Sequence, residues 1–227
     1  MSQASFSPAL FGFLSELRDH NDRAWFQANK ARYEAVARDP ALRFIEAIAP
    51  ALAAISPHVE ANAKPSGGSL FRIYRDTRFS ADKSPYKTHI GMHFRHLAGD
   101  DVHTPGFYLH LEPGGCLAGV GLWEPQGPAL AAVRGAIVEH VAEWAELKAG
   151  LAAEGLTWMG EALSRPPKGF DKDHLHIEDL KRKSFAVQRI FRDDEVCAPG
   201  FVEAFAETAR LAAPLNAFLC AALDLPF

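Results

Sequence analysis

Apolar residues recur every three to four positions through the first quarter of the chain, which is the spacing of amphipathic helices. Asp22 is suited to cap a second helix, and Asp39 followed by Pro40 is a typical start for a third. Pro50 lies inside that third helix and is expected to kink it or end it early. We therefore predict a helical layer over about residues 7–56.

The period of the pattern changes from 3.6 to 2 after the turn cluster at 65–68. Alternation of apolar and polar residues then predicts four strands, at 71–78, 90–94, 107–112 and 116–123. The loops between them are too short to hold crossover helices, so consecutive strands should pair antiparallel. The segment Pro113-Gly114-Gly115 has the composition of a hairpin turn. These features predict a β-meander over about residues 69–124.

The last part of the chain, about residues 128–227, is mainly helical by pattern. A helix is predicted from about 128 to 149, and the C-terminal helix is expected to break near Pro214. Between these helices, 181–187 is compatible with a strand or a loop. No internal repeat or long linker divides the chain, so we predict a single α+β domain over residues 1–227. Its fold would be an antiparallel β-meander of about four or more strands packed against N-terminal, central and C-terminal helices.

The composition is that of an ordinary globular protein, with 227 residues of which 48% are apolar. The three cysteines are widely spaced, which argues against a disulfide framework or a zinc cluster and favours a reducing cytoplasm. The N-terminus lacks a basic stretch followed by an apolar core, and the most apolar run, 47–55, is about half the length that spans a bilayer. We therefore expect a cytoplasmic protein that is neither exported nor embedded in a membrane.

The charge is unevenly distributed along the chain, although the net charge is only −4. Residues 72–96 hold six basic and two acidic side chains, and residues 165–192 hold eight basic and four acidic ones. The remainder of the chain is strongly acidic, which argues against a protein that coats nucleic acid. If the two basic segments meet in space, they form one electropositive site; each could equally be a solvated face.

The first basic segment begins with the pattern R-x-x-R-D-x-R, formed by Arg72, Arg75, Asp76 and Arg78. The planar guanidinium fork matches carboxylate and phosphate oxygens, so the pattern indicates an anion site. Strand alternation places Arg72, Asp76 and Arg78 on the polar face and Arg75 on the core face. Arg75 would then need a bulge that turns it outward or a carboxylate partner. A salt-bridge ladder with a purely structural role would use the same residues.

We predict that the polar face of the sheet, the loop beside it and the second basic segment together form a ligand site. Its predicted residues are Arg72, Asp76, Arg78, Lys83, Lys87, His89, His93, Tyr108, His110, Lys168 and Lys183.

The histidines do not form a convincing metal site by spacing. On a strand, His89 and His93 point the same way but lie roughly 13 Å apart. His93 could approach His110 on the next strand, with Glu112 as a third ligand. The only support for such a site is that these side chains are predicted on the same face of the sheet. The sequence also has no nucleophile elbow and no phosphate-binding glycine loop. We therefore predict no metal and no cofactor, and the pattern indicates no catalytic residues.

The sequence resembles the DUF2461 family, a group of bacterial and fungal proteins of unknown function. The central match is FRIYRDTRFS at 71–80 followed by DKSPYKT at 82–88. Shorter matches are WF at 25–26, GFYL at 106–109, PKGF at 167–170 and KSF at 183–185. The resemblance covers almost the whole chain and implies one domain, but it implies no activity and no catalytic residues.

Two functional hypotheses follow. The first is a site for a small phosphate- or carboxylate-bearing molecule, which the protein binds and on which it could act as an enzyme. The alternative is a nucleic-acid-binding module that uses both basic segments, with tyrosines available for base stacking. A structural role, with function in a protein interface, is a third reading of the same charges. The oligomeric state is not indicated by the sequence.

Overall fold

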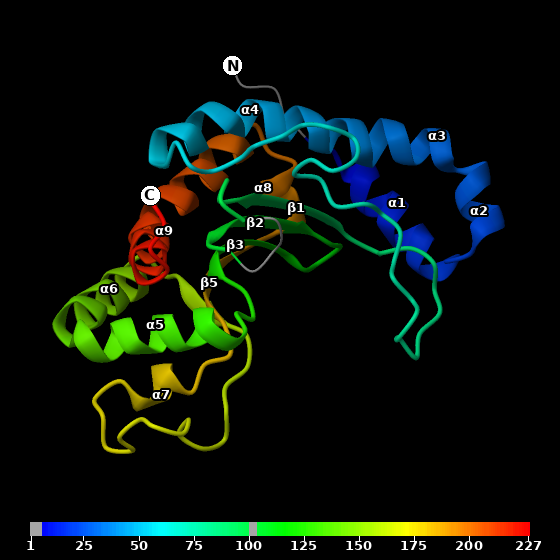
Figure 1. Cartoon of the computed structure of the whole chain (residues 1–227). Coiled ribbons are helices and arrows are strands. Elements are labelled where there is room, and N and C mark those ends of the chain that lie inside the picture. Colours follow the sequence, from blue (N-terminus) through cyan, green and yellow to red (C-terminus); the bar gives the residue numbers. More distant parts are fainter. Residues whose placement is uncertain (1–5, 100–103) are drawn as a thin grey trace.

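A five-stranded antiparallel sheet packs against helices from the N-terminal, central and C-terminal parts of the chain (Figure 1). The computed structural model describes residues 6–99 and 104–227. Within these ranges the fold is α+β, as the sequence predicts. The helices are α1 (Pro8–Asp19), α2 (Arg23–Ala28), α3 (Lys30–Tyr33), the π-helix η1 (Glu34–Arg38), α4 (Asp39–Ile55), α5 (Gly127–Glu139), α6 (Val141–Ala153), α7 (Ile177–Leu180), α8 (Asp193–Val196) and α9 (Phe201–Ala222). The strands are β1 (Ile90–Arg95), β2 (Gly106–Leu111), β3 (Cys116–Leu122), β4 (Thr157–Met159) and β5 (Phe185–Phe191).

The N-terminal helices form the predicted layer, with one difference in its third helix. The Asp22 carboxylate accepts a hydrogen bond from the backbone N–H of Trp25 at 2.9 Å, which confirms the predicted cap. The prediction that Pro50 could end its helix early is wrong, because α4 continues to Ile55. Pro50 is on the exposed side of α4, where water can hydrate the carbonyl that proline leaves unpaired.

The C-terminal half differs from the prediction in similar ways. The single helix predicted over about 128–149 is two helices, α5 and α6, separated at His140 by a non-helical backbone angle. Helix α9 runs through Pro214 without ending there, and Pro214 is again exposed. None of the helices in residues 6–99 and 104–227 is at once long and apolar enough to cross a membrane.

The strands of the sheet are ordered β1-β2-β3-β5-β4, and every neighbouring pair is antiparallel. The meander of β1, β2 and β3 agrees with three of the four predicted strands, and the turn before β3 has Gly114 at φ +72°. The strand predicted at 71–78 is wrong, since that segment makes only the isolated bridge Tyr74↔Tyr86. The Asp76 carboxylate accepts from the backbone N–H of Arg78 at 3.2 Å, and this local turn competes with strand pairing.

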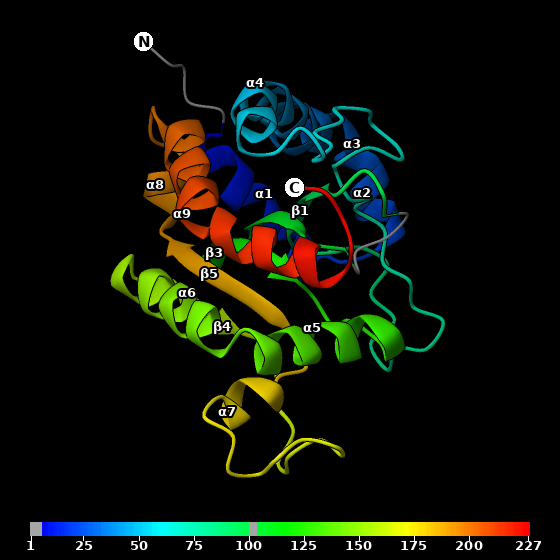
Figure 2. The same cartoon turned by 60° about the vertical axis from the view of Figure 1, so that its left-hand side comes forward.

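Helices cover one face of the sheet, and that face forms the core. Alternate residues of β1 and β2, including Met92, Phe94 and Leu109, are fully buried there. Phe205 of α9 lies between sheet and helices, with its ring centroid 5.8 Å from Phe94 and 5.6 Å from Phe44 of α4. Figure 2 shows α9 crossing the sheet on this side. On the opposite face most side chains are half-buried, and no long helix of residues 6–99 and 104–227 covers it.

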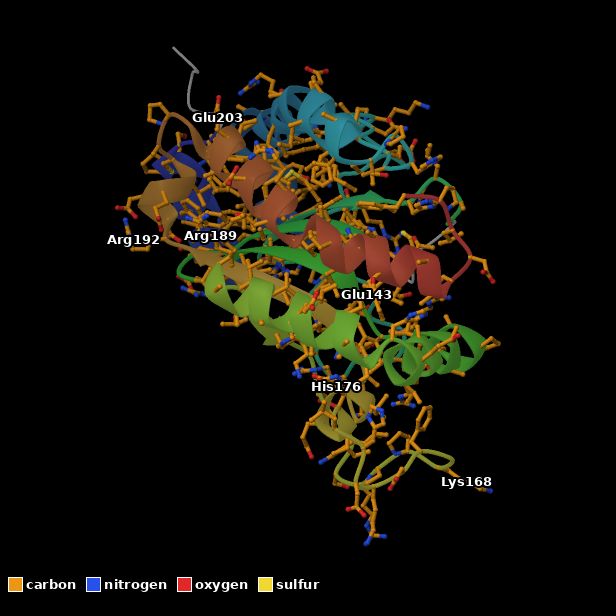
Figure 3. All side chains as sticks on the ribbon, turned by 90° about the vertical axis from the view of Figure 1, so that its left-hand side faces the viewer. Glu143, Lys168, His176, Arg189, Arg192 and Glu203 are labelled. Carbon is orange, nitrogen blue, oxygen red and sulfur yellow. The ribbon has the colours of Figure 1, made fainter. Side chains whose placement is uncertain are left out.

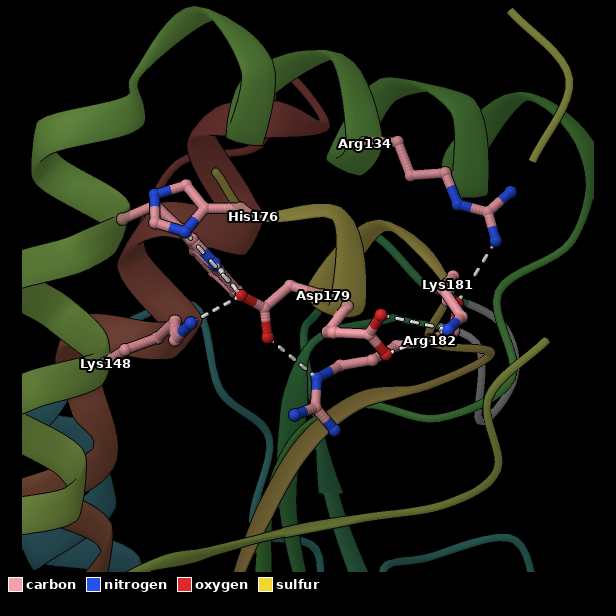
Figure 4. A network of polar contacts seen from close by, with 8 residues as sticks. Arg134, Lys148, His176, Asp179, Lys181 and Arg182 are labelled. Carbon is pink, nitrogen blue, oxygen red and sulfur yellow. Dashed lines mark hydrogen bonds and ion pairs between the residues drawn. The ribbon is translucent and has the colours of Figure 1, made fainter. Parts of the chain in front are cut away.

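The segment from 160 to 184 forms a separate excursion below α5 and α6, with Lys168 at its far tip (Figure 3). It is attached through Asp179, which is 3% exposed and accepts hydrogen bonds from three donors (Figure 4). These donors are Trp144 Nε1 at 3.1 Å, Lys148 Nζ at 2.6 Å and Arg182 Nε at 3.1 Å. Burial alone raises the pKa of Asp179, but the three hydrogen bonds outweigh it and hold the pKa below its usual value.

Replacing Asp179 by Ala should lower the free energy of unfolding by on the order of 3 kcal/mol, because two cations lose their shared carboxylate. Glu178→Ala is the matched control, since that carboxylate is 76% exposed and its ion pair with Lys181 should be worth no more than about 1 kcal/mol. Urea unfolding of both variants measures the difference. Equal effects would contradict the anchoring role of Asp179.

Candidate functional site

The segment before β1 covers the outer edge of the sheet and then leaves it as a long loop (Figure 1). Glu60 donates its backbone N–H to the Arg95 carbonyl at 2.9 Å, and Phe71 donates to the Gly91 carbonyl at 2.9 Å. Beyond Phe71 the chain forms an irregular hairpin, in which Lys87 donates its backbone N–H to the Ile73 carbonyl at 2.8 Å. We call residues 72–88 the cationic loop.

Two contacts fix the cationic loop on the N-terminal helices. The side-chain amide of Asn21 donates to the Tyr86 carbonyl at 3.0 Å, and its oxygen accepts from the Tyr86 backbone N–H at 3.0 Å. The Tyr86 ring stacks on Phe26 of α2, with ring centroids 4.0 Å apart. The C-terminal end of α1 and the cationic loop are thereby brought side by side.

Between them is a polar hollow of about 500 Å³, which we call the cationic hollow. It is lined by Arg18, Asn21, Arg75, Asp82, Ser84, Tyr86, Lys87, Thr88 and His89. Arg75 forms an ion pair with Asp82, so the carboxylate partner that a half-buried Arg75 requires is present in the loop itself. Asp82 in turn accepts from the Ser84 hydroxyl at 2.6 Å.

The positive charge of the cationic hollow is not fully neutralised. Lys87 is half-buried, and no carboxylate within the described residues forms an ion pair with it. Burial lowers the pKa of Lys87, and the nearby Arg72 guanidinium lowers it further. Burial likewise lowers the pKa of His89 to about 4, with His110 and Lys87 acting in the same direction. An anion would stabilise the charged form of both groups.

Next to His89, three polar residues at alternate positions of the β2 strand and its extension form a hydrogen-bonded chain. The Tyr108 hydroxyl lies 3.1 Å from His110 Nδ1, and His110 Nε2 lies 3.2 Å from Glu112 Oε2. With Glu112 ionised, Nε2 carries the proton and Nδ1 accepts from the tyrosine hydroxyl. The His89 ring contacts this chain, with its centroid 4.4 Å from that of His110. Burial, with a smaller effect of Glu112, raises the pKa of Tyr108 to about 12.

The open face of the sheet contains a second hollow of about 360 Å³, which we call the glycine groove. It is lined by Phe71, His93, Gly106, Tyr108, Gly119, Val120, Gly121, Trp123, Met159 and Ala186. The strand register shows which residues form the floor of the groove. One row across the sheet contains His93, Tyr108 and Gly119, and the next row contains Gly106, Gly121, Ala186 and Met159.

The structure brings some of the predicted site residues together. Lys87 and His89 line the cationic hollow, and His93 and Tyr108 line the glycine groove. His110 lies between the two hollows, in contact with His89 and Tyr108.

Other predicted residues lie outside both hollows. Asp76 and Arg78 pair with each other on the exposed part of the loop, where Arg78 lowers the pKa of Asp76 to about 2. Arg72 is exposed, and Lys83 donates to the Thr77 carbonyl at 2.9 Å.

No basic residue of the second basic segment lines either hollow, so the structure does not bring Lys168 or Lys183 to the site. Lys183 pairs with Glu161 at 2.6 Å, and Lys168 is at the tip of the 160–184 excursion (Figure 3). Sequence reasoning missed Arg18, Asn21 and Gly119. Asn21 could have been identified from its position between two predicted helices. A polar side chain at such a position can form hydrogen bonds with the backbone of a segment distant in sequence.

Within the described residues, no group of three or more His, Cys, Asp or Glu side chains is placed to hold a metal ion. The strand register places His93 opposite Tyr108 and His110 opposite Gly91, so the two histidines are not direct cross-strand neighbours. His110 instead forms hydrogen bonds with Tyr108 and Glu112.

The geometry defines an α+β protein with a cation-lined hollow beside an apolar groove on the open face of its sheet. The chain matches the family described as conserved hypothetical protein (DUF2461) over residues 9–218, and it belongs to that family. No curated protein and no solved structure matches the chain.

Replacing His89 by Gln should reduce the acid sensitivity of the fold. The pKa of His89 is about 4 in the folded protein, below its ordinary value of 6.5, so the unfolded chain binds more protons between these pH values. His89 therefore makes the wild type less stable as pH falls from 6.5 to 4. Urea unfolding at pH 7 and pH 4.5 should show a smaller loss for His89→Gln than for the wild type.

The control for this experiment is His20→Gln, at an exposed position on α1's C-terminal side. It should lose as much stability on acidification as the wild type does. If His89→Gln also loses the full amount, the buried neutral state assigned to His89 is wrong.

Proposed function

We propose that this protein binds a small phosphate- or carboxylate-bearing molecule, with the anionic group in the cationic hollow. The observation that carries the proposal is the half-buried ammonium of Lys87, which has no ion-pair partner within the described residues and lies near a second half-buried base, His89. Removing a cation from water without pairing it is costly, and an anionic ligand supplies the missing partner.

The surroundings of Lys87 suit a small anion. Arg75 is oriented by Asp82 and lines the same hollow, so a guanidinium and an ammonium face one space. Arg18 lines it from α1 and adds a second guanidinium. The hollow is concave and of the size range in which small molecules bind.

The alternative of a nucleic-acid-binding module has less support. It requires both basic segments on one surface, but several cations of the second segment pair with carboxylates close by. Lys181 pairs with Glu178, Arg182 with Asp179 and Lys183 with Glu161. A phosphate backbone would have to compete with these pairs.

Replacing Lys87 by Met should weaken anion binding about 10- to 100-fold, because it removes one charge-assisted contact. Titration calorimetry and thermal shift with inorganic phosphate, sulfate, sugar phosphates, nucleotides and organic acids, at constant ionic strength, provide the measurement. At a fixed ligand concentration, the wild type should gain more thermal stability than Lys87→Met.

The matched control is Lys168→Met, which makes the same change of charge at the tip of the 160–184 excursion, far from the hollow. Its affinities should equal those of the wild type. An equal loss in both variants would point to a general charge effect, and no saturable binding of any anion in the panel would overturn the proposal.

A further inference from the structure

The glycine groove beside the cationic hollow indicates what the rest of the ligand is, on the basis of the function proposed above. We propose that the groove holds an aromatic ring of the same molecule, so that the ligand class is an aromatic anion such as an aryl phosphate or an aromatic carboxylate.

Gly119 is the residue that most directly indicates a ligand. A Cβ at Gly121 would lie 2.2 Å from the Phe185 carbonyl oxygen, and one at Gly106 would lie 2.6 Å from the Phe94 carbonyl oxygen, so the fold itself requires glycine at both positions. At Gly119 the nearest atoms to such a Cβ are Met159 Sδ at 3.6 Å and Tyr108 Cβ at 3.7 Å, which are ordinary contacts. Its φ is also outside the left-handed region.

Glycine within a strand destabilises the fold relative to alanine. Since neither backbone conformation nor neighbouring atoms require glycine at position 119, its effect is to leave the centre of the groove floor open. The neighbouring row on this face contains Gly106, Gly121 and Ala186, so the floor beside Gly119 is made of small residues.

The walls of the groove suit a planar ring. Phe71, Tyr108 and Trp123 present aromatic rings, and Met159 adds a thioether. Aromatic and thioether groups of this kind favour aromatic partners through stacked, edge-on and sulfur–ring contacts. The volume of about 360 Å³ lies near the lower end of the range for small-molecule sites, which fits a single ring system.

The groove and the cationic hollow are adjacent, because side chains that line one contact side chains that line the other. The Lys87 ammonium lies 5.1 Å from the centroid of the Phe71 ring, so a cation of the hollow contacts a wall of the groove. On the other side, His89 of the hollow packs on His110, whose ring is hydrogen-bonded to Tyr108 of the groove. The Glu112–His110–Tyr108 chain also fixes the orientation of the Tyr108 wall, which lowers the entropy cost of binding.

The test compares phenyl phosphate with methyl phosphate, which carry the same anionic group and differ in the ring. Calorimetry on the wild type should show phenyl phosphate binding about 10- to 100-fold more tightly, the range expected for burying one phenyl group. Gly119→Val should remove this advantage and leave the affinity for methyl phosphate unchanged. Gly119→Ala should remain folded, because its Cβ fits, and should reduce the advantage in part.

Gly150→Ala is the control, since it adds a methyl group in open space on α6. It should keep the full preference for phenyl phosphate. Thermal unfolding of each variant without ligand checks that the fold is intact.

A second measurement does not depend on any variant. The chain has three methionines, of which Met159 lines the groove and Met92 is buried in the core on the other face. With methyl-labelled methionine, phenyl phosphate should shift the Met159 methyl signal much more than methyl phosphate does, and the Met92 signal should stay in place.

The outcomes separate the two proposals. Equal affinity for the two phosphates, with no selective shift of Met159, would overturn the aromatic assignment while leaving the anion site intact. Retention of the full preference in a folded Gly119→Val variant would also overturn it. If neither phosphate binds, the proposed function fails, and the aromatic assignment fails with it.

Discussion

The site depends on the contact between Asn21 and Tyr86, which joins segments 65 residues apart. A single side-chain amide satisfies both backbone polar groups of Tyr86, and the Tyr86 ring stacks on Phe26. The cationic loop has almost no regular secondary structure of its own, so this contact provides order that a strand ladder would otherwise provide. Without it, Arg75 and Lys87 would have no fixed position relative to Arg18.

A second constraint is that helices cover only one face of the sheet. The covered face is mainly apolar and buried, whereas the open face carries half-buried polar and aromatic side chains between glycines. An antiparallel sheet tolerates this asymmetry because its strands alternate in facing. The segment that pairs with β1 closes the outer edge of the sheet and delivers Phe71 to the open face. Edge protection and formation of the groove wall therefore come from the same stretch of chain.

The sequence predicts those features that depend on local pattern. Alternation is sufficient for β1, β2 and β3, and an aspartate before a helical run is sufficient for the cap at Asp22. The facing of His93 and Tyr108 follows from the same alternation. The family was also predictable from short motifs spread along the chain.

Features that depend on distant contacts could not be predicted in this way. The segment 71–78 alternates like a strand, but Asp76 and Arg78 bind each other and the local backbone. Pro50 and Pro214 are tolerated within helices because each is on an exposed side, and exposure is a property of the packed structure. The net charge of a segment does not show whether Lys168 and Lys183 lie close to the first basic segment in space. It contains no information on which carboxylates lie beside each lysine in the fold.

The two basic regions of this protein differ in how their cations are paired with carboxylates. Around Asp179, one buried carboxylate accepts hydrogen bonds from two cations and an indole N–H, so Lys148 and Arg182 both have a carboxylate partner within the fold. In the cationic hollow, Asp82 neutralises Arg75, but Lys87 and His89 are partly desolvated without a carboxylate of their own. The cationic hollow therefore has a charge imbalance, and it is beside an open groove. This imbalance is a cost to the folded state alone, and binding of an anion is the physical process that would offset it.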